Sequence, residues 1–236
     1  MSLKATGIIK RFGGATALGG VDLELGEREV LGLIGPNGSG KTTLVNCISG
    51  VLQIDGGAVE LDGRDLTKES RVRRSRAGIA RTFQTPRLFR ELTVDENVTI
   101  GANAAPRSAR SRERIEALLG RLGLFGMRRE VVSSLPYGYQ RRVEIARALA
   151  SGPTVLLLDE PAAGLNDTET AELLELIVEV RNEHACAAVL IDHDMSLVMK
   201  ASDRVQVLDE GNVIFVGAPE DAFKQDHVVE AYLGVV

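Results

Sequence analysis

The chain has 236 residues, of which 44% are hydrophobic and 26% are charged, and its formal net charge is −5. This length fits one large domain or a domain with lobes, and the negative charge disfavours a broad nucleic-acid-binding surface. No apolar run approaches the roughly 18 residues of a membrane-spanning helix, and Cys47 and Cys186 are expected to be small buried residues in a reducing compartment.

The first third of the chain is predicted to be rich in strands. Partial alternation of apolar and polar residues indicates strands over 3–11 and 17–25, and an apolar run indicates another over 28–34. A helix is expected over 43–48, and a short strand over 58–61 is bracketed by glycine-containing turns.

The middle of the chain is predicted to be helical. Thr93 and Glu96 have the spacing of a capping box, so a helix should begin directly after Thr93. Apolar residues at helical spacing predict further helices through 115–122 and 139–150. The stretch 86–151 therefore has the pattern of a helical lobe inserted into an α/β protein.

The last third returns to alternating elements. Strands are predicted over 154–158 and 187–191 with a helix over 168–183 between them, which implies a parallel sheet with helices on its faces. A further helix over 195–201 precedes a predicted hairpin over 204–216.

Arginines gather in two stretches, with seven between residues 71 and 90 and four between 107 and 114. The favoured interpretation is a solvated face. The alternative is a docking rim for a partner or for anionic lipid headgroups.

The stretch GPNGSGKTT fits the phosphate-loop pattern G-x-x-x-x-G-K-[ST] and lies between a predicted strand and a predicted helix. Its glycines let successive backbone N–H groups point inward, and the helix N-terminus adds further donors. Lys41 would place its charge between the β- and γ-phosphates, and Thr42 would offer a hydroxyl to Mg²⁺. The candidate nucleotide-binding residues of this stretch are Gly35, Asn37, Gly38, Ser39, Gly40, Lys41, Thr42 and Thr43.

Two carboxylates follow the predicted buried strand that ends at residue 158. Asp159 would lie beside the phosphates and hold Mg²⁺ through water, as in other P-loop NTPases. Glu160, one residue later, could polarise the attacking water as a general base. The alternative is an acidic turn after a core strand, and the pairing with a phosphate loop favours the catalytic interpretation.

Further motifs occur in a fixed order around these two sites. The stretch LPYGYQRR at 135–142 resembles the signature sequence of ABC-transporter ATPases, usually L-S-G-G-Q. Gln84 resembles the family's Q-loop glutamine, AGLN at 163–166 its D-loop and His193 its switch histidine. Phe12 stands where the family stacks an aromatic ring on adenine. The chain is identified as a member of this family.

Within the family, the motifs RTFQTPRLF, LPYGYQRRVEIARAL, DEPAAGLN, HDMSLVM and AYLG are most similar to the ATP-binding subunits of branched-chain amino acid importers. Urea and amide importers have similar subunits, so the solute stays open. Lipopolysaccharide-export ATPases share the VEIARAL and AYLG-like features, but they normally carry a more usual signature.

The resemblance implies an α/β P-loop NTPase fold with a RecA-like core, an N-terminal antiparallel β subdomain and an inserted helical subdomain. The single domain 1–236 would comprise a core with its β subdomain (1–85 and 152–236) and the helical part (86–151). ATP and Mg²⁺ would be bound, with Thr42, Gln84 and Asp159 at the metal. Glu160 and His193 would be the catalytic residues.

The resemblance also implies partners. A second ATPase subunit, identical or sister, would face the first head to tail, and its signature residues would cap each ATP. These trans residues are Leu135, Pro136, Tyr137, Gly138, Tyr139 and Gln140. The pair would drive transmembrane permease subunits served by a periplasmic or surface solute-binding protein, which places it in the cytoplasm at the inner face of the cell membrane.

Three residues depart from the family pattern. Pro136 replaces a serine and can donate neither a hydroxyl nor an N–H, so Ser134 is considered as a substitute donor. Tyr137 replaces a signature glycine, and Asn166 replaces the D-loop aspartate.

Other functions are considered as well. The chain could be a soluble scaffold ATPase of the same family, as in iron–sulfur cluster assembly, or a P-loop kinase or GTPase. For single residues, Gln84 could be an ordinary surface residue, His193 a residue near a helix cap, and Phe12 a core aromatic.

Overall fold

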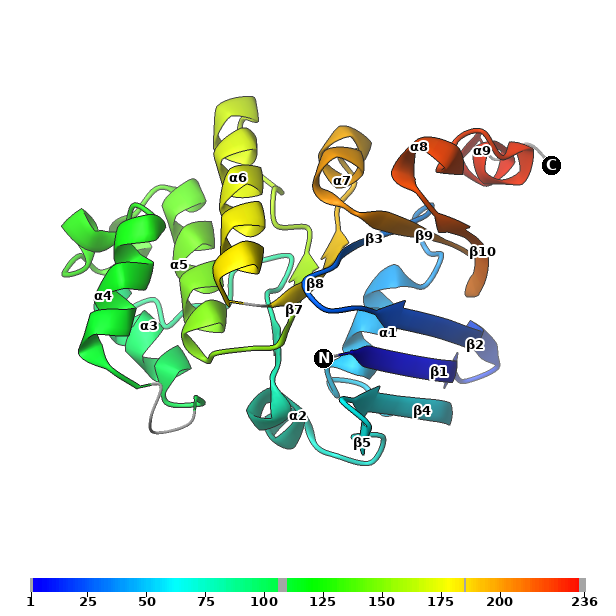
Figure 1. Cartoon of the computed structure of the whole chain (residues 1–236), viewed down its shortest axis with the longest axis horizontal. Helices are drawn as coiled ribbons and strands as arrows, with labels where there is room; N and C mark the ends of the chain where they lie inside the picture. The colour runs from blue at the N-terminus through cyan, green and yellow to red at the C-terminus, as the bar shows by residue number, and fades with distance from the viewer. Residues whose placement is uncertain (1, 106–109, 185, 234–236) are drawn as a thin grey trace.

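The computed structural model describes residues 2–105, 110–184 and 186–233. Two sheets lie side by side, and a group of helices extends from one end of the larger sheet (Figure 1). Within those ranges, no helix has both the length and the apolar character to cross a membrane.

The smaller sheet is antiparallel and has the strand order β2-β1-β4-β5. Its strands are β1 (Leu3–Phe12), β2 (Ala15–Leu25), β4 (Gly56–Leu61) and β5 (Arg64–Asp65). The strands β1, β2 and β4 confirm those predicted over 3–11, 17–25 and 58–61. The alternation in β1 buries Leu3, Ala5 and Ile8 and leaves the intervening face toward solvent.

The larger sheet has six strands in the order β10-β9-β3-β8-β7-β6. They are β3 (Val30–Ile34), β6 (Ile79–Arg81), β7 (Val155–Asp159), β8 (Ala187–Ile191), β9 (Arg204–Asp209) and β10 (Asn212–Gly217). All neighbours are parallel except β9 and β10, which form the predicted hairpin. The central parallel strands β3, β7 and β8 are fully buried, as expected for a sheet covered on both faces.

Helix α1 (Lys41–Ile48) packs against both sheets, because Leu44 shares one hydrophobic core with Leu31 and Leu33 of β3 and with β1. The alternate residues of β3, Val30 and Ile34, belong to a second core on the opposite face of the sheet. The remaining large helices contribute to this second core. The strand β3 is therefore packed on both faces, and it holds the following loop and α1 in place.

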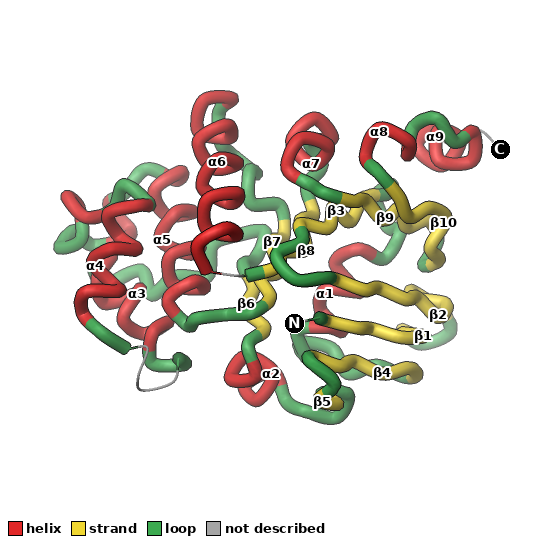
Figure 2. Tube along the Cα trace, viewed as in Figure 1, coloured by secondary structure: helices red, strands yellow, loops and turns green. Residues whose placement is uncertain are grey.

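The helices of the second face form two groups (Figure 2). Helices α3 (Val94–Ala102), α4 (Arg112–Arg121) and α5 (Tyr137–Ala150) lie together at one end, with α6 (Asp167–His184) and α7 (Met195–Ala201) nearer the sheet. The chain ends with α8 (Pro219–Ala222) and α9 (Asp226–Leu233). The capping box of Thr93 and Glu96 is present in both directions. The boundaries 86–151 of a separate helical subdomain stay a prediction.

The arginine-rich stretch forms a helix, α2 (Arg71–Ala77), and part of it is not solvated. Arg74 is 2% exposed and donates to the carbonyls of Cys47 at 2.7 Å and Ile48 at 2.8 Å. It therefore adds side-chain donors to the last carbonyls of α1, where backbone donors run out; the carbonyl of Cys47 also accepts from the N–H of Gly50 at 3.2 Å. The expected solvated face is therefore wrong for Arg74, and also for Arg81, whose side chain is 8% exposed.

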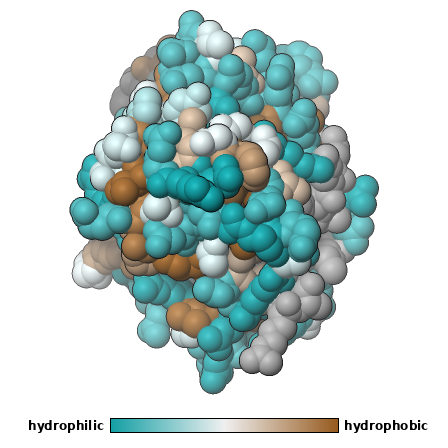
Figure 3. Space-filling view, turned by 90° about the vertical axis from the view of Figure 1, so that its left-hand side faces the viewer, coloured by the Kyte–Doolittle hydropathy of each residue, from teal (hydrophilic) through white to brown (hydrophobic). Residues whose placement is uncertain are grey.

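The second arginine stretch does fit a solvated face where it is described; Arg107 lies outside the described residues. Arg112 pairs with Asp95 at 2.7 Å and with Glu116 at 2.8 Å on the outer surface of α4. The end of the molecule formed by these helices is mostly hydrophilic, with separate brown patches (Figure 3).

Candidate functional site

The phosphate loop follows β3 and needs glycine at two close approaches. Gly35 and Gly40 have positive φ angles of 143° and 103°. A Cβ atom on Gly35 would lie 2.0 Å from the carbonyl oxygen of Leu208, and one on Gly40 would lie 2.9 Å from that of Ala17. The loop is thus pressed between β9 and β2, where only glycine fits.

The hairpin turn between β9 and β10 supports this loop. The N–H of Gly211 donates to the carbonyl of Ser39 at 3.0 Å, and the N–H of Gly19 donates to the carbonyl of Gly211 at 2.9 Å. The turn therefore joins the phosphate loop to β2. Ser39 itself is 2% exposed, so its position is fixed by packing as well.

Lys41 begins α1 and points back over the loop. Its Nζ donates to the carbonyls of Gly35 at 2.7 Å and Pro36 at 2.8 Å. Burial lowers the pKa of the ammonium, and the nearby carboxylates of Glu160 and Asp159 oppose that shift. The loop thus combines a held positive charge with the free N–H groups of a helix N-terminus, which is a site for an anion.

Asp159 ends β7, the strand next to the edge strand β6, and is 3% exposed. Its Oδ2 accepts from Nη2 of Arg81 at 3.0 Å, and its N–H donates to Oγ1 of Thr82 at 3.3 Å. Burial raises the pKa of this carboxyl group, and Arg81 opposes the rise. Arg81 also donates to Oδ1 of Asn46 in α1 at 2.5 Å, so it links the carboxylate to the helix that follows the phosphate loop.

Glu160, Gln84 and His193 come together beside Asp159. Nε2 of Gln84 donates to Oε2 of Glu160 at 2.8 Å, and Nδ1 of His193 lies 3.9 Å from the same oxygen. Glu160 adopts a positive φ of 46°, and its N–H donates to the carbonyl of Ile191 at 2.7 Å. Backbone strain of this kind in a residue other than glycine concentrates at functional sites.

His193 is largely exposed and is oriented by its neighbour. Its Nδ1 lies 3.3 Å from Oδ1 of Asp192, whose carboxylate is buried and also accepts from the N–H of Ala162 at 3.1 Å. Asp192 therefore ties the end of β8 to the segment after β7. Sequence reasoning did not select it, although its position directly after a buried strand was a signal.

Phe12 ends β1 and is 50% exposed, so it is not a core aromatic. It pairs with Ala15 across the hairpin, and Nζ of Lys10 lies 5.5 Å from the centre of its ring. The adjacent strand β2 contacts the phosphate loop at Ala17. An exposed ring beside such a loop can stack on a flat base.

The signature residues surround the start of α5, which begins at Tyr137 directly after Pro136. The ring of Tyr137 packs on Gly164, where a Cβ atom would meet Cε1 of the ring at 2.9 Å. A Cβ atom on Gly138 would lie 2.7 Å from Oε1 of Glu169. The departure at Tyr137 thus brings the signature stretch into contact with the segment that resembles the D-loop of the same chain.

The other two departures also have local partners. Asn166 and Glu169 exchange two hydrogen bonds of 3.0 Å, each side chain accepting from the other's N–H, which caps α6. Ser134 donates its hydroxyl to the carbonyl of Val131 at 2.7 Å, so in this structure that proton is not free for a ligand. The side chain of Gln140 donates to the carbonyl of Leu135 at 2.8 Å.

The residues expected at Mg²⁺ supply suitable donor atoms. Thr42 offers a hydroxyl, Asp159 keeps Oδ1 beyond its bond to Arg81, and Gln84 keeps Oε1 because its nitrogen donates to Glu160. Oxygen ligands of this type, completed by phosphate oxygens and water, suit Mg²⁺. Among the described residues, no group of three or more His, Cys, Asp and Glu side chains could hold a metal ion, and a phosphate-dependent Mg²⁺ site does not need one.

The glycine loop before α1, the carboxylates at the end of β7 and the parallel sheet define a P-loop nucleotide-binding protein. The family model described as ABC transporter matches residues 18–163. The chain belongs to the ABC transporter family, and its fold class is the predicted one.

Relatives and solved structures agree with this assignment. The chain is 44% identical over 248 aligned positions to the high-affinity branched-chain amino acid transport ATP-binding protein LivG of Salmonella typhimurium, covering 98% of this chain and 97% of LivG. It is 41% identical to BraF of Pseudomonas aeruginosa, with the same coverage. The ADP conformation of MJ1267, an ATP-binding cassette of an ABC transporter, matches with a TM-score of 0.88, 30% identity and complete coverage of both chains. The predicted resemblance to importer subunits is confirmed.

Proposed function

We propose that this chain is the ATP-hydrolysing subunit of an importer for branched-chain amino acids or related small solutes. The observation that carries the proposal is the cluster of Gln84, Glu160 and His193 beside the phosphate loop. Similarity to LivG and BraF, which are named as high-affinity branched-chain amino acid transport ATP-binding proteins, supports the class of solute. The direction of transport rests on the importer-like motifs.

Hydrolysis would use groups that are already close together. The Glu160 carboxylate would accept a proton from water while the water oxygen bonds to the γ-phosphorus and the bond to the β–γ bridging oxygen breaks. His193 would donate a hydrogen bond to the γ-phosphate. Lys41 would hold the β- and γ-phosphate charge, and the products would be ADP and phosphate.

Thr42, Asp159 and Gln84 would hold Mg²⁺, which neutralises phosphate charge when bound. Arg81 would keep the buried Asp159 ionised and pointed toward that site, because its guanidinium lies 3.0 Å from Oδ2. The ring of Phe12 would carry the adenine. These assignments rest on proximity in the structure and on the family motifs.

A second ATPase subunit, identical or sister, would complete each site. The first turn of α5 begins at Tyr137 on the surface, with Tyr137 itself 39% exposed, so its N–H groups could face the phosphate of an ATP bound to the partner. Because Pro136 lacks a donor and the Ser134 hydroxyl is engaged, Gly138 and its neighbours would make this contact through their backbone.

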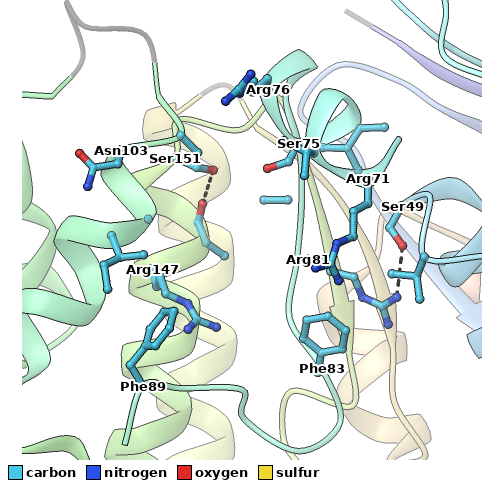
Figure 4. Close-up of a pocket in the computed structure, with 18 residues that line it drawn as sticks. Ser49, Arg71, Ser75, Arg76, Arg81, Phe83, Phe89, Asn103, Arg147 and Ser151 are labelled. Atoms are coloured by element: carbon cyan, nitrogen blue, oxygen red, sulfur yellow. Dashed lines mark hydrogen bonds between the residues drawn. The ribbon is translucent and has the colours of Figure 1, made fainter. Parts of the chain in front are cut away.

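A groove of about 550 Å³ offers a surface for the permease (Figure 4). One wall comes from α3 and α5 and includes Arg147, and the other comes from α2 and β6 and includes Arg71 and Arg81. The segment between β6 and α3 adds Phe83 and Phe89. The groove thus runs between the nucleotide-binding sheet and the helices that carry the signature residues.

The lining of this groove indicates what would bind in it. Val51, Val72, Phe89 and Ile100 expose between 37% and 51% of their surface. Arginines stand around these apolar side chains. We therefore propose that a short cytoplasmic segment of the permease occupies the groove, with apolar side chains and at least one carboxylate to pair with the arginines.

Reconstitution tests the function. The chain is co-expressed with candidate permease subunits and a solute-binding protein, and uptake of labelled leucine into ATP-loaded vesicles is measured. Import that requires ATP and is lost in Glu160→Gln supports the proposal. An active ATPase that never copurifies with membrane subunits would instead favour a soluble scaffold role.

The groove has its own test. Val72→Glu combined with Arg76→Glu adds negative charge to the groove and should release the permease during purification while ATP binding is retained. The control is Arg112→Glu on the outer face of α4, 47% exposed, which should leave copurification intact. Equal copurification of both variants would place the permease elsewhere.

A further inference from the structure

Arg141 of α5 is a fully buried cation that the catalytic roles above do not use. Its side chain and that of Glu144 are both 0% exposed and form an ion pair of 2.8 Å within one turn of the helix. Among the polar side-chain atoms of this pair, Nε of Arg141 is the one without a hydrogen-bond partner. A charge in such a place needs several acceptors, because its transfer out of water is strongly unfavourable unless it is paired and hydrogen-bonded.

The other acceptors of Arg141 are backbone carbonyls of the two segments that carry the candidate catalytic side chains. Nη1 donates to the carbonyl of Phe83 at 2.6 Å, and Nη2 donates to that of Gln84 at 2.6 Å. Nη2 also donates to the carbonyl of Glu160 at 3.1 Å. One guanidinium therefore contacts the main chain of both Gln84 and Glu160, whose side chains are joined to each other at 2.8 Å.

Glu144 completes this connection from the same helix. Its Oε1 accepts from the N–H of Arg87 at 3.0 Å while its Oε2 holds Arg141. The pair on α5 thus fixes both ends of the segment 83–87. It also holds the carbonyl of Glu160, whose left-handed backbone is strained for a residue other than glycine and needs support from its surroundings.

We propose that Arg141 is a positioning residue that sets the placement of Glu160 relative to Gln84 according to the position of α5. The inference rests on the proposed role of Glu160 as general base. A shift of α5, which begins with the signature residues, would move three carbonyls through one rigid planar group. When a partner subunit contacts the signature residues and α5 shifts, the movement would be transmitted to Glu160 through Arg141.

A stabilising role and a positioning role of the Arg141–Glu144 pair predict different results when the pair is replaced. Replacing a buried ion pair with apolar residues of similar size is often neutral or stabilising, whereas removing one partner is strongly destabilising. A purely structural pair and a positioning pair therefore differ in what an apolar replacement of both members does to turnover.

The experiment compares three full-length variants with the wild type. Arg141→Lys keeps the charge beside Glu144, but a single ammonium cannot reproduce the planar fork that spans three carbonyls. Arg141→Met combined with Glu144→Leu removes the pair and fills its volume. Arg112→Lys, in an exposed ion pair of the neighbouring helix α4, is the control. Turnover, KM for ATP with Mg²⁺ and the thermal midpoint are measured for each.

We expect kcat of Arg141→Lys to fall about 10- to 100-fold while KM changes by less than about threefold, because the base is misplaced and the phosphate loop is untouched. The double apolar variant should also turn over slowly, whatever its thermal midpoint, because no side chain then joins the carbonyls of Gln84 and Glu160. Arg112→Lys should match the wild type in all three quantities.

Two results would overturn the inference alone: kcat of Arg141→Lys within about twofold of an active wild type, or recovery of kcat together with stability in the double variant. If the wild type showed no Mg²⁺-dependent hydrolysis under conditions where it binds ATP, the proposed function would fail first, and the role of Arg141 with it.

Discussion

Gln84 and Glu160 are separated by 76 residues, and yet Nε2 of Gln84 donates to Oε2 of Glu160 at 2.8 Å. The segment that carries Gln84 also contributes Phe83 to the wall of the groove between α2 and α5. A ligand in the groove and a nucleotide at the phosphate loop would therefore act on one short piece of chain. In the proposed function, this relationship would couple a membrane partner to hydrolysis.

Removing the charge of the phosphate loop should weaken nucleotide binding. We expect Lys41→Ala to lower the affinity for ATP about 10- to 100-fold, or about 1.4–3 kcal/mol, because the phosphates lose a charge-assisted donor. Titration calorimetry on the purified chain measures the change. Lys224→Ala, an exposed lysine paired with Asp221, is the control. Undiminished affinity in Lys41→Ala would remove that residue from the site.

The buried carboxyl group of Asp159 should make stability depend on pH. Burial raises its pKa above the ordinary 3.8, so the ionised form costs stability near neutral pH, and that cost disappears as pH falls through the raised pKa. Without nucleotide and Mg²⁺, we expect Asp159→Asn to unfold at a higher temperature than the wild type near neutral pH. The difference should shrink in acid.

Arg81 would not be left without partners in this variant, because it keeps three other acceptors, Asn46 Oδ1, Ser49 Oγ and the carbonyl of Thr82. The raised pKa of Glu144 is common to both proteins and cancels in the comparison. A lower thermal midpoint for Asp159→Asn than for the wild type near neutral pH would contradict the expected gain in stability.

The exposed ring of Phe12 should contribute to adenine binding. We expect Phe12→Ala to lose about 1 kcal/mol of ATP affinity, roughly a fivefold weaker Kd, with little change in thermal stability because the ring is half exposed. Phe125→Ala, which removes a 40% exposed aromatic ring shortly after α4, serves as the control. If the two variants bound ATP equally well, the stacking role of Phe12 would be wrong.

The two thiols should be inert in the folded protein. Burial raises the pKa of Cys47 to about 11 and that of Cys186 to about 12, so little thiolate forms near neutral pH. We expect a thiol reagent to label neither residue in the native chain and both after denaturation. Rapid labelling of native protein would show that these cores open readily.

Much of the fold follows from local patterns in the sequence. The bounds of β8 and α7 match the predicted ranges, because an apolar run and a cap at Asp194 define them locally. The strand β6 was not predicted, since it has only three residues and is specified by its pairing with β7. Helix α2 was hidden by its arginines. Of these, Arg74 is buried, and its burial depends on distant carbonyls of α1.

The residues of the candidate site also differ in whether a local sequence pattern reveals them. The phosphate loop, Asp159 and Glu160 were selected from short motifs that carry their own chemistry. Arg81 and Arg141 were not, because their partners lie 78 and 57 residues away in the chain and no local pattern marks a buried arginine. Contacts that connect a site to the rest of a protein are set by the tertiary structure.

The most direct measurement compares the wild type with Glu160→Gln for ATP binding and for ATP hydrolysis in the presence of Mg²⁺. We expect both proteins to bind ATP, and we expect the variant to hydrolyse it at least about 100-fold more slowly, because its amide cannot accept the proton of the water. The variant should also collect as a dimer in ATP during size-exclusion chromatography, while Glu172→Gln, an exposed carboxylate of α6, should behave as the wild type. Equal turnover by Glu160→Gln and the wild type would contradict the account.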